Sequence, residues 1–153
     1  MKLVAIITVL IGLARLCFLP TIVSGDSMEP TLGSGEIHLA DQRLYRNNSP
    51  IRGDVVLAQK EQGGDLVVKR IVGLPGEEIK MVWGRIYIDG VLLEEPYLHP
   101  ESGWCMLPKT LGEGEYWIIG DNRDVSLHLT VGREEIVGKL ITPSIHEDPS
   151  SQI

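Results

Sequence analysis

The pattern of hydrophobic and polar positions divides the chain into two parts. Residues 3–23 form a nearly continuous apolar run, LVAIITVLIGLARLCFLPTIV, with Arg15 as its one charge and Lys2 just before it. A membrane-spanning helix needs about 20 apolar residues, so this run predicts a transmembrane anchor. Lys2 favours a cytoplasmic start, and the Arg15 side chain is expected to reach toward the outer interface. A cleaved secretory signal or a buried core element is also compatible with the run.

Beyond this run the apolar stretches are short and separated by Gly and Pro, which is typical of β-strands. The pair Asp89-Gly90 between two apolar stretches indicates a tight hairpin. No later stretch shows a 3.6-residue apolar period, so the pattern predicts an all-β barrel or sandwich. The tail at residues 142–153 has no core pattern and is expected to fray. The expected strands are residues 35–40, 54–59, 65–73, 85–93 and 115–121.

Composition narrows the possible functions. A chain of 153 residues suits one domain that buries its own core. Its formal charge of −7 argues against nucleic-acid binding, which needs a basic surface. Cys17 and Cys105 cannot form a disulfide framework, and neither stands in a zinc-ligand spacing.

Ser27 stands in the first of three segments that combine reactive side chains with Gly or Pro. This segment, residues 24–32, reads SGDSMEPTL. A nucleophilic serine needs an exposed hydroxyl, backbone N–H groups for the oxyanion and a base. The segment is not the G-x-S-x-G elbow of the α/β-hydrolases. Taken alone, it is equally explained as a polar turn after a helix.

Lys69 stands in the second segment, LVVKRIVGLPG, in the middle of an apolar run. A strand lysine that points inward loses hydration, which lowers its pKa from about 10.4. A pKa of roughly 8 would correspond to about 3 kcal/mol of differential solvation and would yield an amine able to accept a proton. A solvent-facing edge position is the simpler alternative.

The third segment, GDNRDVS at residues 120–126, follows an apolar strand. Asp121, Arg123 and Asp124 are expected to form a charge-assisted hydrogen-bond cluster, and Ser126 offers a hydroxyl that can orient a neighbour. A polar turn would also account for this segment when it is taken alone.

In their order along the chain, the anchor, SGDSMEPTL, RGDVVLA, VVKRIVGLPGE and GDNRDVS resemble the type I signal peptidases. These are membrane-anchored Ser/Lys peptidases that remove signal peptides from exported preproteins. The resemblance extends to about Leu140. It implies that Ser27 is the nucleophile and Lys69 the general base. It also implies that Ser126 holds Lys69 in place, with Asp121 and Arg123 in a structural cluster behind the site.

The resemblance also implies how substrate is bound. The backbone N–H of Ser27 would be one oxyanion donor, and Gly25 stands where some relatives supply a second donor, so no side-chain hydroxyl serves from there. Small apolar pockets would select small residues at the first and third positions before the cut. The residues expected to line these pockets are Val23, Met28, Leu32 and Val68.

The same resemblance implies the overall organisation. An anchor at residues 1–22 would precede a mainly β catalytic domain at residues 23–141, a partly open barrel or sandwich with a small β insertion at about 79–114. The implied partners are preproteins and membrane lipid, without nucleic acid, metal or organic cofactor. The implied location is a plasma membrane, crossed once, with the domain on the extracytoplasmic side; an organellar inner membrane is the alternative. Nothing in the sequence indicates an oligomeric state.

One segment departs from the family pattern. Relatives often continue G-D-N-R-D-N-S-x-D-S-R, with the last Asp and Arg in a supporting salt-bridge network, whereas this chain has Val125, His128, Leu129 and Thr130 there. Either His128 and its neighbours compensate, or the chain is a divergent relative that binds substrate with little or no activity.

Three further alternatives stay open. They are a self-cleaving Ser/Lys protein of the SOS-repressor type, a membrane-tethered β-domain used as a binding module, and a triad built on a histidine. The available histidines are His38, His99, His128 and His146.

Overall fold

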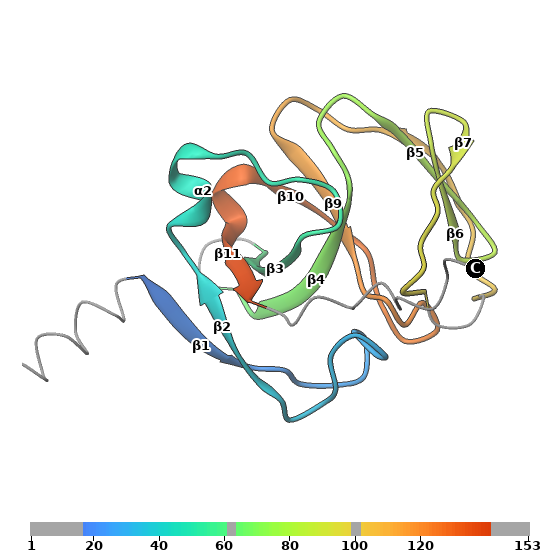
Figure 1. The fold of residues 1–153 in the computed structure, drawn as a ribbon. Coiled ribbons are helices and arrows are strands. Elements are labelled where there is room, and N and C mark those ends of the chain that lie inside the picture. The colour runs from blue at the N-terminus through green and yellow to red at the C-terminus, as the bar shows by residue number, and fades with distance from the viewer. Residues whose placement is uncertain (1–16, 61–63, 99–101, 142–153) are drawn as a thin grey trace, which may run out of the picture.

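The computed structural model describes residues 17–60, 64–98 and 102–141 and shows a mainly β fold. Two antiparallel sheets lie side by side (Figure 1). The larger sheet has the strand order β1-β2-β11-β3-β4-β9-β10, and the smaller has the order β7-β6-β5-β8. The larger sheet contains β1 (Phe18–Ile22), β2 (Ile37–Asp41), β3 (Val55–Gln59), β4 (Leu66–Gly73), β9 (Glu115–Ile119), β10 (Leu129–Gly132) and β11 (Ile136–Ile141). The smaller sheet contains β5 (Glu78–Val82), β6 (Arg85–Ile88), β7 (Val91–Leu92) and β8 (Met106–Thr110). Two short helical elements are also described, α2 (Leu44–Asn47) and the 3₁₀ turn η1 (Arg133–Glu135).

The prediction of a mainly β fold is confirmed, and each expected strand overlaps an observed one. The hairpin at Asp89-Gly90 joins β6 to β7, with φ angles of 50° and 81° at the two turn residues. Two successive positive φ angles match the right-handed twist of the paired strands, which is why Asp-Gly is favoured there. The smaller sheet, with the segments between its strands, is called the small lobe below. It lies at the place where the insertion is predicted.

The predicted anchor needs a correction at its C-terminal end. Phe18–Ile22 is strand β1, which pairs with β2, and is not the end of a helix. Pro20 is compatible with this strand because β1 lies at the edge of the sheet, where a missing N–H is tolerated. Residues 1–16 of the predicted anchor, like the tail, lie outside the described residues. Within the described part of the chain, no helix is both long enough and apolar enough to cross a bilayer.

Three clusters of buried side chains hold the fold together. One lies between β3, β4, β9, β10 and α2, and a second packs β2, β3 and β11 against the segment that contains Met28 and Leu32. The third joins the two sheets, because Trp117 and Ile119 of β9 pack against Ile79 of β5. The small lobe is therefore docked against β4, which contains Lys69, and β9, which precedes the 120–126 segment.

Candidate active site

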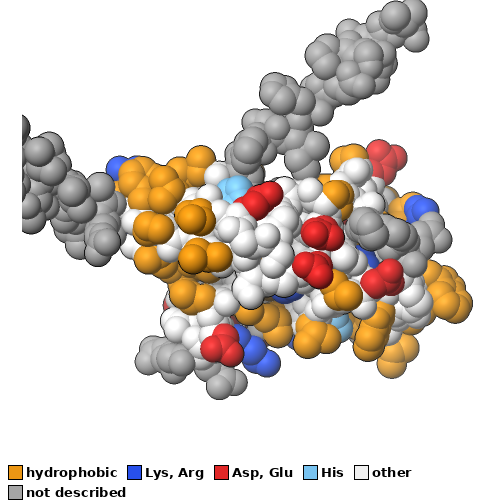
Figure 2. Space-filling view, turned by 90° about the horizontal axis from the view of Figure 1, so that it is seen from below, with side chains coloured by type: hydrophobic (Ala, Val, Ile, Leu, Met, Phe, Trp, Pro, Cys, Tyr) orange, Lys and Arg blue, Asp and Glu red, His pale blue; other side chains and the backbone are white. Residues whose placement is uncertain are grey.

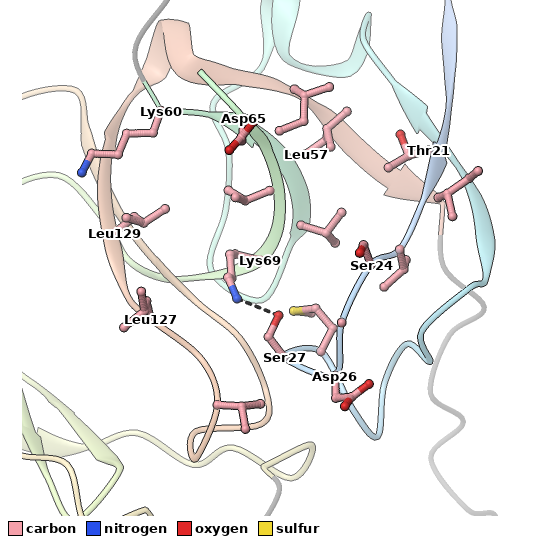
Figure 3. Close-up of a pocket in the computed structure, with 18 of the residues that line it drawn as sticks. Thr21, Ser24, Asp26, Ser27, Leu57, Lys60, Asp65, Lys69, Leu127 and Leu129 are labelled. Carbon is pink, nitrogen blue, oxygen red and sulfur yellow. Dashed lines mark hydrogen bonds between the residues drawn. The ribbon is translucent and has the colours of Figure 1, made fainter. Parts of the chain in front are cut away.

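Ser27 and Lys69 meet in a cleft of the larger sheet. Lys69 projects from β4, and Ser27 lies in the turn that follows β1. The Nζ atom of Lys69 is 2.7 Å from Oγ of Ser27, and Figure 3 shows the two side chains pointing toward each other. Lys69 is 8% exposed, while Ser27 is half-buried and faces the cleft. A serine hydroxyl thus lies within hydrogen-bond distance of a buried amine, in a space that a ligand can enter.

Ser126 fixes the direction of the lysine side chain. Its Oγ lies 3.0 Å from Nζ of Lys69 and accepts a hydrogen bond of 2.7 Å from the backbone N–H of Gly120. Because Gly120 directly follows the core strand β9, the hydroxyl of Ser126 is tied to the end of a rigid element. The structure therefore brings together Ser27, Lys69 and Ser126, the three reactive residues that the sequence singles out.

Burial lowers the pKa of Lys69 to about 8, because the ammonium form loses hydration inside the protein. The negative charge of Asp121 opposes this shift. That carboxylate, however, is already paired with Arg70, with distances of 2.8 and 2.6 Å from its two oxygens to Nε and Nη2. Among the described residues, no carboxylate forms an ion pair with Lys69, and its neutral form is well populated near pH 8.

The cluster behind the site differs from the predicted one. Asp121 pairs with Arg70 and accepts a hydrogen bond from Thr31, whereas Arg123 pairs with Glu95, so Asp121 and Arg123 do not pair with each other. Asp124 is exposed. Side chains alternate across a strand, so Arg70 points away from Lys69 toward the sheet's other face, and this is the signal that could have identified it.

Three of the four predicted pocket residues line the cleft, which has a volume of about 970 Å³. They are Val23, Met28 and Val68. Leu32 is not among the lining residues, because it is buried in the core cluster below the cleft. Part of the opposite wall, not predicted from the sequence, consists of Val125, Leu127 and Leu129. Their spacing of two in VSLHL was the available signal.

Gly25 lies at the mouth of the cleft with φ of 82°, a conformation that favours glycine. Its N–H donates a hydrogen bond of 3.1 Å to Oγ of Ser34, which fixes the turn before Ser27. As expected, no side-chain hydroxyl is available at this position.

Two of the substituted residues of the GDNRDVSLHLT segment, His128 and Thr130, lie outside the cleft, whereas Val125 and Leu129 line it. The ring of His128 packs against Trp117 at a centroid distance of 5.2 Å, and Thr130 accepts a hydrogen bond of 2.8 Å from Lys109. Neither lines the cleft. His128 therefore does not replace an acidic partner of Lys69, and the site is supported instead by Arg70 and Arg123.

A histidine-based site finds no support in the described part of the chain. His38, on β2, pairs with Glu36 just before that strand, and neither His38 nor His128 lines the cleft. His99 and His146 lie outside the described residues. Within those residues, no three His, Cys, Asp or Glu side chains are grouped so that they could bind a metal ion.

A hydroxyl held against a desolvated amine in an open cleft is typical of hydrolases that use a serine nucleophile and a lysine base. The family described as signal peptidase, peptidase S26, matches residues 1–143 of the chain. The chain belongs to this family, and the resemblance inferred from its motifs is confirmed.

Individual relatives agree with this assignment. Signal peptidase I U of Bacillus subtilis is 36% identical over 134 residues, which cover 81% of this chain and 72% of the relative. Signal peptidase I of Bacillus licheniformis is 34% identical, covering 80% and 72%. A probable signal peptidase I-2 of Synechocystis sp. is 30% identical, covering 76% of this chain and 58% of the relative. A crystal structure of a signal peptidase I from Enterococcus faecalis aligns with a TM-score of 0.49 at 26% identity, over 60% of this chain and 97% of that chain.

Proposed function

We propose that this protein is a serine endopeptidase that removes N-terminal signal peptides from exported preproteins, with Ser27 as nucleophile and Lys69 as general base. The observation that carries the proposal is the 2.7 Å approach of Nζ to Oγ, combined with burial that lowers the pKa of the amine to about 8. A neutral amine at this position can take the hydroxyl proton as the oxygen attacks.

The reaction would proceed in two stages. Oγ of Ser27 attacks the scissile carbonyl while Lys69 takes the hydroxyl proton, and the ammonium then protonates the leaving amine, which leaves an acyl-enzyme. Lys69 next activates a water that hydrolyses the ester and regenerates Ser27. Ser126 keeps Nζ in place through both stages. The backbone N–H of Ser27 is proposed as one oxyanion donor.

The cleft suits an extended peptide with small side chains near the cut. Residues 66–69 of β4 pair with β3 on one side, and β9 pairs with β4 only from Arg70 onward. β1 is likewise an edge strand. Among the described strands, nothing pairs with these two edges, so a peptide strand can be added between them. Val23, Met28 and Val68 would then form the small apolar pockets.

A membrane location is proposed on two observations. The apolar run at residues 3–23 ends four residues before Ser27. Strands β1 and β2 also expose Ile22, Ile37 and Leu39, and Figure 2 shows hydrophobic side chains gathered on the side of the molecule where these strands lie. Both features favour a catalytic domain that rests at the extracytoplasmic face of a membrane, where the cleavage region of a threaded preprotein emerges.

The test is cleavage of a preprotein with a small-x-small site by the full chain in detergent. Ser27→Ala and Lys69→Ala are each expected to abolish cleavage. Ser49→Ala and Lys80→Ala make the same changes at exposed positions outside the cleft and are expected to leave it intact. If the folded wild-type chain cuts none of several preproteins, the inactive substrate-binding alternative becomes the better interpretation.

A further inference from the structure

A turn of the small lobe lies against both arginines behind the site. It comprises residues 95–98, follows β7 and is closed by a hydrogen bond of 3.0 Å from the N–H of Leu98 to the carbonyl oxygen of Glu95. The ring of Tyr97 lies 3.8 Å from the guanidinium carbon of Arg70. The Glu95 carboxylate pairs with Arg123, and these two side chains are 2% and 1% exposed.

The two contacts of the turn are themselves connected. The hydroxyl of Tyr97 donates a hydrogen bond of 3.0 Å to Oε1 of Glu95. Arg123 also donates to the carbonyl oxygen of Gly84, in the turn between β5 and β6. The turn thus ties the small lobe to the catalytic sheet through buried charged groups, in addition to the apolar packing between the sheets.

From each arginine a short series of contacts leads to Lys69. Arg123 donates a hydrogen bond of 3.1 Å to the carbonyl oxygen of Gly120, whose own N–H binds Oγ of Ser126, the neighbour of Nζ. Arg70 holds Asp121, whose charge acts on Lys69. Neither Glu95 nor Tyr97 lines the cleft.

We infer that the 95–98 turn is a positioning element of the peptidase site: Tyr97 and Glu95 hold Arg70 and Arg123, and through them fix the surroundings of Lys69. The inference rests on the proposed function for its meaning in catalysis, but its structural content can be measured without turnover.

The charge balance of the buried network explains why the position of Arg70 affects the protonation of Lys69. Arg70 and Arg123 are matched by Asp121 and Glu95, so the network is neutral only while Lys69 is neutral. If the Tyr97 ring is lost, Arg70 gains freedom and Asp121 becomes available to Lys69, which favours the ammonium form. The other charged groups that line the cleft with Lys69 are Asp26, Lys60 and Asp65, and these would be unchanged.

The experiment compares Tyr97→Leu with Tyr97→Phe in the full chain in detergent. The protonation of Lys69 is followed by NMR of lysine labelled with ¹³C at Cε, and kcat/KM is followed against pH. Tyr97→Leu is expected to raise the pKa of Lys69 by about half a unit or more and to move the acidic limb of kcat/KM upward by the same amount. Tyr97→Phe keeps the ring against Arg70 but loses the hydrogen bond to Glu95, so it is expected to raise the pKa of Lys69 less than Tyr97→Leu does.

Tyr87→Leu in β6 is the matched control, since Tyr87 lies in the small lobe and pairs with Leu92, away from Arg70. Unchanged titration of Lys69 in a folded Tyr97→Leu protein would overturn the inference. If turnover is absent in every variant but the NMR titration moves as expected, the proposed function fails and the positioning role stands.

Glu95→Gln provides a second test that keeps the shape of the side chain. Without the negative charge of Glu95, its ion pair with Arg123 is lost, and Gly120 and Ser126 are expected to be positioned less precisely. This should lower kcat about tenfold with little change in KM. An effect confined to thermal stability, with kcat unchanged, would assign the turn a structural role only and would contradict the inference.

Discussion

Gly120 lies directly against the carbonyl oxygen of Ser27. A Cβ atom at Gly120 would stand 2.0 Å from that oxygen and 2.5 Å from Oγ of Ser126. The same carbonyl accepts a hydrogen bond of 3.1 Å from the N–H of Asn122. The turn that contains Ser27 and the 120–126 segment are therefore in backbone contact. The position of Ser27 relative to Lys69 depends on the absence of a side chain at residue 120.

This contact predicts that Gly120→Ala inactivates a folded enzyme. Neither the carbonyl of Ser27 nor the core strand β9 can move far, so the added methyl group must displace Ser27 or Ser126. A displacement of about 1 Å between reacting groups costs on the order of 100-fold in rate, so kcat/KM should fall at least that much. Gly103→Ala is the control, because a Cβ atom there meets nothing within 4 Å. Activity within a fewfold of wild type would show that the contact is not needed.

The pH dependence of kcat/KM should report Lys69. Because the protonated amine cannot accept a proton, kcat/KM should fall about tenfold per unit below the pKa of about 8 and level off above it. The measurement is initial-rate cleavage of a peptide substrate without titratable groups near the cut. A limb centred near pH 6.5 would point to a histidine base, and one above pH 10 would point to an unperturbed lysine.

Replacement of His128 should leave activity nearly unchanged. Its ring packs on Trp117, and burial lowers the pKa of its imidazole. The neighbouring side chains that do line the cleft belong to Leu127 and Leu129. His128→Leu is therefore expected to keep kcat/KM within about twofold, because leucine preserves an apolar contact with Trp117 and position 128 lies outside the cleft. Leu127→Asp changes the wall itself and should weaken cleavage, mainly through KM. A His128→Leu enzyme with lost kcat would instead support compensation by the histidine.

Much of the site could be predicted from the sequence because its chemistry is concentrated in short segments. Ser27, Lys69 and Ser126 each stand in a short segment with Gly, Pro or an apolar run, and such segments can be recognised without knowledge of the fold. The strands were equally visible, since their alternating or continuous apolar runs are bounded by turn residues.

The network behind the site could not be predicted in the same way. Arg70 and Asp121 are 51 positions apart, and Arg123 and Glu95 are 28 apart. Only the pairing of β4 with β9 and the docking of the small lobe reveal which carboxylate each arginine meets. The prediction that Leu32 lines a pocket differs from the structure for a related reason. Its apolar character fits a core position as well as a cleft wall, and only the fold decides between them. At the N-terminus, the continuous apolar run 3–23 concealed the start of β1, because a buried or edge strand and a helix end share the same composition.

Lys69 should also make the protein less stable than it could be, which Lys69→Met can test. The pKa of Lys69 is lowered from 10.5 in the unfolded chain to about 8 in the folded one. Below pH 8 both states bind the proton, and the folded state bears the whole cost of burying the charge, up to about 3 kcal/mol. Between pH 8 and 10.5 the unfolded state binds more protons, so stability rises with pH, and above 10.5 the cost has vanished.

Lys69→Met removes this charge while it keeps a side chain of similar length. We expect the variant to unfold at a higher temperature than wild type at pH 6 to 7, and the difference to shrink as the pH rises from 8 to 10.5. Lys80→Met, at an exposed position on β5, should change the melting temperature little and without this pH dependence. Thermal unfolding followed by circular dichroism across this pH range provides the comparison. A Lys69→Met protein less stable than wild type at pH 6 would mean that the hydrogen bonds of Nζ to Ser27 and Ser126 outweigh the desolvation of the amine, and the low pKa would then need another cause.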